Sequence, residues 1–119
     1  MDKEKKIEWI LRIAVAGEFI GHGALAMGGK ADWVGWIQQL SGLSQPLALN
    51  IIVAIGVIDI ILALIVLFRP VRPLLLWMAF WGFFTAILRP IVGQSIWDFI
   101  ERFANWGAPL ALFYLLKKE

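Results

Sequence analysis

Long apolar runs constrain this chain more than any other feature. Three stretches, at residues 7–27, 47–68 and 74–92, are each about 20 residues long and mostly apolar. At about 1.5 Å of rise per residue, a helix of that length crosses the roughly 30 Å hydrocarbon core of a bilayer. Of all residues, 61% are hydrophobic and 17% charged, whereas soluble domains have about 45–50% apolar and ~25% charged residues. We therefore predict an integral membrane protein.

A fourth run, residues 96–116, has the length of a span but is less apolar. Its first half carries Asp98, Glu101, Arg102 and Asn105. Four spans would leave only short connections, and short connections make consecutive helices antiparallel. The prediction is an all-α fold with one transmembrane domain over residues 1–119, arranged as a four-helix bundle.

The basic residues predict the orientation of this bundle. They cluster at the ends of the apolar runs, on one side of the predicted membrane: Lys3, Lys5, Lys6, Arg69, Arg72, Lys117 and Lys118. Cytoplasmic connections are enriched in Lys and Arg, so both termini are expected to face the cytoplasm of a bacterial inner membrane. Because the basic residues form no continuous stripe, we expect no binding to nucleic acid.

The first outer connection has the pattern of a short amphipathic helix. Asp32 is a suitable N-cap, and Gly42 ends the pattern. The apolar positions between them follow helical spacing: Trp33, Trp36, Ile37 and Leu40. Such a helix can lie in the membrane interface with its tryptophans at headgroup depth, or it can act as a lid over a binding site.

Two local signals describe the fourth run. Ser95 followed by Asp98 resembles a capping box, which starts a helix near Ile96. Pro109 has no backbone N–H, so it leaves the carbonyl of Asn105 without a helical donor. We therefore expect a kink at that point of the fourth helix.

Several polar residues lie at membrane depth, where charges are costly and are functional candidates. Counted along the helices, they fall between the midplane and the outer surface: Glu18, His22, Asp59, Arg89, Glu101 and Asn105. Small residues near them, including the GxxxG pair Gly17 and Gly21, allow helices to approach closely. The expected site is a polar cluster enclosed by the outer half of the bundle.

Three interpretations of this cluster remain open. In the first, it is structural, and Arg89 is neutralised by Glu101 or Glu18, because buried charges require partners. In the second, it binds a quinone or a lipid headgroup, and His22 and the carboxylates handle protons. In the third, which a single histidine and no cysteine make weaker, Glu18, His22 and Asp59 bind a metal. No serine or cysteine is placed for nucleophilic catalysis, so activity of its own is not expected.

The first two spans and the connection between them carry a set of short motifs: Arg12, Phe19, His22-Gly23 and Lys30, together with Gly56-Val57-Ile58-Asp59. This set resembles the DoxX family of small four-helix bacterial membrane proteins, which more often has Glu at the position of Asp59. The resemblance covers residues 9–70 by motif and the remaining chain by helix count. The resemblance implies association with quinone-linked redox complexes, in which relatives occur as membrane subunits.

The leading hypothesis is an accessory membrane subunit that holds a quinone-type or lipid-like ligand among the polar residues. An alternative is a small transporter or channel component, which would self-associate through Gly17 and Gly21 because four helices enclose little volume. A third hypothesis is a purely structural subunit of a larger membrane complex. The expected partners are therefore the lipid bilayer and other membrane subunits.

Overall fold

The computed structural model describes residues 1–116, which form helices and short connections without any strand. The helices are α1 (Lys3–Met27), α2 (Ala31–Ser41), α3 (Gln45–Phe68), α4 (Arg72–Ile91), α5 (Ile96–Ile100) and α6 (Ala104–Leu115). By length and hydropathy, α1, α3 and α4 can each cross a membrane. The all-α class is thus confirmed, and the three most apolar runs are helices of sufficient length and hydropathy to span a membrane, with ends within a few residues of those predicted.

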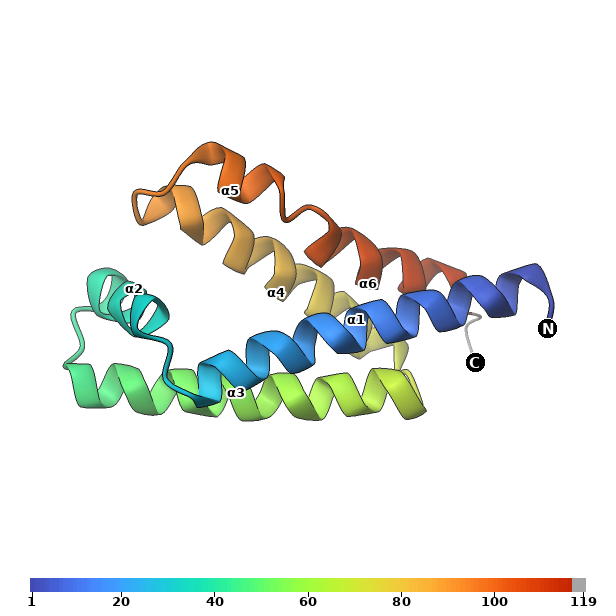
Figure 1. Ribbon diagram of the computed structural model, residues 1–119, viewed down its shortest axis with the longest axis horizontal. Coiled ribbons are helices and arrows are strands. Elements are labelled where there is room, and N and C mark those ends of the chain that lie inside the picture. The colour runs from blue at the N-terminus through green and yellow to red at the C-terminus, as the bar shows by residue number, and fades with distance from the viewer. Residues whose placement is uncertain (117–119) are drawn as a thin grey trace.

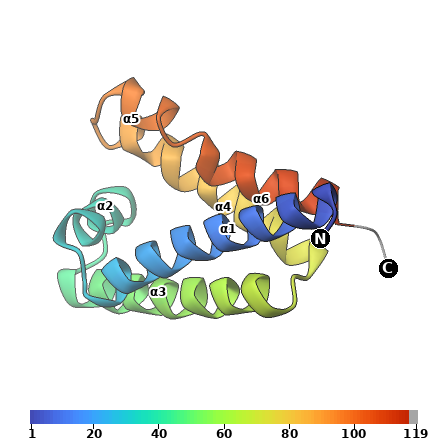
Figure 2. The same cartoon turned by 45° about the vertical axis from the view of Figure 1, so that its right-hand side comes forward.

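The helices form two groups that diverge like the arms of a V. Helices α1 and α3 pack side by side along their lengths and form the first arm, and α4 packs against α5 and α6 to form the second arm (Figure 1). The arms meet where α1 begins and α6 ends, which we call the terminal end, and they separate toward α2 (Figures 1 and 2). Helices α3 and α4, which belong to different arms, contact each other little.

Two apolar clusters stabilise this arrangement. The larger one joins four helices near the terminal end through Val15 and Phe19 of α1, Val66 of α3, Met78 of α4 and Leu112 of α6. The smaller one packs α2 onto the other end of the first arm. Because the larger cluster lies near the terminal end, burial of apolar side chains holds the arms together there.

Two arginines reinforce the terminal end by binding helix carbonyls. Arg12 of α1 donates from Nε to the Val66 carbonyl at 3.2 Å and from Nη2 to the Leu67 carbonyl at 2.5 Å. The Val66 carbonyl would otherwise bond to the amide of residue 70, but that residue is Pro70, which has no N–H. In the second arm, Arg72 donates from Nε to the Phe113 carbonyl near the end of α6, at 3.3 Å.

The fourth run is not one continuous helix as expected. It is interrupted at residues 101–103, between α5 and α6. The Arg102 side chain donates from Nη1 to the Asp98 carbonyl at 2.7 Å, and the Arg102 amide bonds instead to the Phe99 carbonyl. The side chain thus replaces the backbone donor that would continue the α-helix. The start at Ile96, with Ser95 as N-cap, is confirmed.

Pro109 lies inside α6, and the helix that contains it begins at Ala104, directly after the break at residues 101–103. The kink expected at Asn105 stays a prediction. The Asn105 carbonyl, which Pro109 leaves without a helical donor, lies against Gly82 of α4. A Cβ at Gly82 would collide with this carbonyl. Glycine therefore permits the two backbones of the second arm to approach closely at this level.

In the first arm, the close crossing occurs at Gly23 and Gly56. A Cβ on Gly56 would lie 2.7 Å from the Gly23 carbonyl oxygen and 2.7 Å from the Met27 amide nitrogen. The predicted GxxxG residues Gly17 and Gly21 are exposed, and a Cβ on either would meet nothing within 4 Å. Within the described chain, that pair does not mediate a helix contact.

The short amphipathic helix in the first long connection is confirmed as α2. Its end at Gly42 is as expected, because this glycine has a φ of 75°, in the left-handed region. The predicted N-cap is wrong. The helix begins at Ala31 after Lys30, and Asp32 lies in its first turn, where a carboxylate favours the positive end of the helix dipole.

Candidate ligand-binding site

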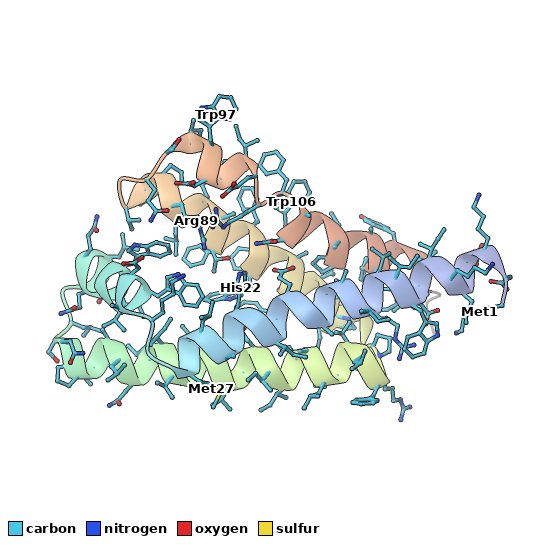
Figure 3. The ribbon with its side chains drawn as sticks, viewed as in Figure 1. Met1, His22, Met27, Arg89, Trp97 and Trp106 are labelled. Atoms are coloured by element: carbon cyan, nitrogen blue, oxygen red, sulfur yellow. The ribbon has the colours of Figure 1, made fainter. Side chains whose placement is uncertain are left out.

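A pocket of about 290 Å³ lies between the diverging arms. Its walls come from the end of α1, from α2, from the middle and first part of α3, and from the second half of α4. Isoleucine, leucine and aromatic side chains form most of the lining, and three ionisable residues, His22, Asp59 and Arg89, take part in it. Figure 3 shows His22 and Arg89 pointing into the space between the arms.

Helix α2 covers one side of this pocket with its apolar face. All four residues of the predicted apolar stripe line the pocket: Trp33, Trp36, Ile37 and Leu40. Two glycines with positive φ, Gly29 and Gly42, flank the helix. The position of the stripe favours the lid interpretation of α2 over that of a helix anchored by the same face in the membrane interface.

Arg89 forms the cationic part of the pocket wall. Its residue surface is only 5% exposed, yet among residues 1–116 no ion pair engages it. The guanidinium donates from Nη1 to the Thr85 carbonyl at 2.5 Å, and its central carbon lies 5.2 Å from the centre of the Trp36 ring. This arrangement orients the side chain and leaves further guanidinium N–H donors for a ligand.

Asp59 forms the anionic part, on the opposite arm. It is also 5% exposed and has no ion pair within the described part of the chain. Removing a charge from water without a partner costs several kcal/mol. The pocket therefore holds two buried ionisable groups of opposite sign, one on α3 and one on α4, which do not neutralise each other.

His22 and Glu18 extend the polar region along α1. His22 lines the pocket, and its ring meets the edge of Trp33 at 5.8 Å between centroids. Glu18, one turn closer to the terminal end on the same helix, does not line the pocket. Of the predicted site residues, three thus face the pocket and a fourth lies near one of them.

The other two predicted site residues lie outside this pocket. The exposed Glu101 forms an ion pair with Arg102, at 2.7 Å between Oε1 and Nη1. Asn105 is half-buried and places its backbone carbonyl against Gly82. The expected neutralisation of Arg89 by Glu101 or Glu18 is therefore not observed in residues 1–116. No residue of α5 or of the break after it lines the pocket.

Sequence reasoning missed several aromatic contributions from α4. Trp81 and Phe84 line the pocket, with ring centroids 5.6 Å apart, and Trp77 stacks on Trp81 at 5.7 Å. These residues recur every three or four positions, which is the spacing of one helix face. In a chain this rich in aromatic residues, that spacing alone does not distinguish a pocket wall from a lipid-facing surface.

The described side chains do not assemble a metal site. No group of three or more His, Asp or Glu residues in the described part lies close enough to hold an ion. Glu18, His22 and Asp59, the metal ligands considered from the sequence, therefore do not form such a group. The pocket instead offers an apolar surface, a hydrogen-bond donor group at Arg89 and an acceptor group at Asp59, which together suit an amphipathic molecule.

In comparisons with known proteins, no family model, curated protein or solved structure matches this chain. The resemblance to DoxX proteins therefore rests on the short motifs in the first two spans. It stays a prediction.

Proposed function

We propose that this chain is a multi-pass protein of the bacterial inner membrane that binds one amphipathic ligand, of quinone or lipid type, between its two arms. The pocket carries this proposal: an apolar and aromatic lining surrounds Asp59 and Arg89, both buried and without ion pairs in the described chain. A ligand with a polar group and an apolar body would satisfy both kinds of surface.

The proposed role is binding within a larger complex, as an accessory subunit, rather than catalysis by this chain alone. The side chains around the pocket supply hydrogen-bond donors and acceptors, among them the imidazole of His22. Such groups position a ligand and accompany proton transfer at a neighbouring redox centre. The DoxX-like motifs support this role by analogy.

The first test is ligand retention. The double variant His22→Leu/Asp59→Asn removes two of the three ionisable groups from the pocket. We expect it to lose the ligand that copurifies with the wild-type chain, measured by native mass spectrometry and by organic extraction. One defined ligand per wild-type chain is expected.

The matched control is Asp32→Asn, which makes the same change at an exposed position of α2. It should retain the ligand as the wild type does. Helical content and elution volume identify a variant that has failed to fold. If a folded double variant keeps its ligand, the pocket is not the binding site.

A second test concerns the orientation, with both termini in the cytoplasm. The chain has no cysteine, so single introduced cysteines are unambiguous labels. We expect a membrane-impermeant maleimide to label Gln39→Cys and Gln94→Cys in intact cells, and to label Glu4→Cys and Val71→Cys only after lysis. All four positions are exposed, and these substitutions keep every basic residue. Labelling of the second pair in intact cells would reverse the proposed orientation.

A further inference from the structure

Asp59 and Arg89 together define the chemistry that the pocket accepts. They face the same cavity from opposite arms, and no ion pair in the described chain engages either of them. Direct contact would have neutralised both charges. The cavity of about 290 Å³ lies between them instead, which is enough space for a small polar group but not for a whole lipid.

A guest with only one charge would leave one of these residues uncompensated. A lone anion would pair with Arg89 but be repelled by Asp59, and a lone cation would pair with Asp59 but be repelled by Arg89. A neutral carbonyl group would accept hydrogen bonds from Arg89 and offer no donor to the carboxylate of Asp59. A group with one anionic and one cationic part satisfies both residues at once.

The mouth of the pocket indicates where the remainder of the guest lies. Ile51 of α3, Leu40 of α2 and Phe84 of α4 line the pocket and remain exposed, by 38%, 50% and 38% respectively. The arms contact each other little between α3 and α4, so apolar chains can leave the pocket there without crossing a packed interface. A charged head inside and an apolar exit correspond to a lipid.

We propose that the pocket binds the headgroup of a zwitterionic phospholipid with a primary ammonium, such as phosphatidylethanolamine. The phosphate is bound by the guanidinium of Arg89, which can donate two parallel hydrogen bonds to it, and the ammonium is bound by the carboxylate of Asp59. The acyl chains leave between α3 and α4. This inference rests on the proposed function, because it specifies the ligand of the same pocket.

The test uses the full chain in nanodiscs that contain equal amounts of phosphatidylethanolamine and the anionic phosphatidylglycerol. Native mass spectrometry after extraction counts each retained lipid. The wild type should retain phosphatidylethanolamine about tenfold over phosphatidylglycerol, and Arg89→Gln should reduce retention of both by about tenfold or more. Asp59→Asn should abolish the preference, because it removes the charge that repels phosphatidylglycerol and binds the ammonium.

The matched controls are Arg69→Gln and Asp32→Asn, which make the same changes at exposed positions and should preserve the preference. Equal retention of the two lipids by the wild type, or an unchanged preference in folded Asp59→Asn, overturns the zwitterion inference. If the wild type instead retains a quinone that His22→Leu/Asp59→Asn loses, the inference fails while the proposed function stands. Retention of no ligand by the wild type contradicts both.

A last experiment distinguishes binding of the whole lipid from binding of its soluble headgroup alone. Glycerophosphoethanolamine carries the same phosphate and ammonium without acyl chains. It should compete poorly, because it lacks the apolar part that leaves between α3 and α4. If glycerophosphoethanolamine displaced the bound lipid at equal concentration, the proposed exit of the acyl chains between α3 and α4 would be contradicted.

Discussion

Replacing Arg12 with leucine should open the terminal end of the first arm. Arg12 is 6% exposed, and its side chain donates to two carbonyls at the end of α3 and, from Nη1, to Oε2 of Glu8 at 3.0 Å. The Val66 carbonyl has no backbone donor because residue 70 is proline. Loss of a buried charged partner costs about 3–5 kcal/mol. We expect the free energy of unfolding in mixed micelles to fall by about that amount.

Arg69→Leu is the matched control, since Arg69 is exposed at the end of α3. Its effect on unfolding should be small, within roughly 0.5 kcal/mol. Arg12→Lys should recover only part of the stability, because an ammonium lacks the planar fork that reaches two carbonyls and a carboxylate together. Equal stability of Arg12→Leu and the wild type would show that apolar packing alone closes this end.

Substituting Gly56 with alanine should disrupt the crossing of α1 and α3. The new Cβ would lie 2.7 Å from the Gly23 carbonyl oxygen and 2.7 Å from the Met27 amide nitrogen, so backbone atoms would have to move. Overpacking of this kind costs about 1–3 kcal/mol. The expected result is a loss of that size in the free energy of unfolding, measured in mixed micelles.

Gly21→Ala makes the identical change on a face where the new Cβ meets nothing within 4 Å. Alanine favours helix over glycine by about 1 kcal/mol, so this control should be neutral or slightly stabilising. Gly56→Ala is thus expected to lower the free energy of unfolding, whereas Gly21→Ala is not. If Gly56→Ala also stabilises the chain, the two helices do not cross at Gly56.

Parts of the site followed from residue type and helical depth. His22, Asp59 and Arg89 were predicted as site residues because they are ionisable and lie within apolar runs, and all three line the pocket. Glu101 fitted the same rule but lies outside the pocket, paired with Arg102. The rule places a residue along its helix axis, whereas rotation about that axis and a break in the helix decide which way its side chain points.

The sequence alone determined the helices and most of their ends. Apolar runs of membrane-spanning length marked α1, α3 and α4, and single local signals marked Ser95 before α5 and Gly42 after α2. These features depend on hydrophobicity and on hydrogen bonds between residues a few positions apart, so the neighbouring sequence is enough to predict them.

Only the tertiary structure decided how α1 and α3 pair. The glycine contact falls at Gly23 and Gly56 rather than at the sequence motif of Gly17 and Gly21, and Arg12 binds carbonyls more than 50 positions away. Each outcome depends on the rotation and spacing of the two helices, which contacts between residues far apart in the sequence set.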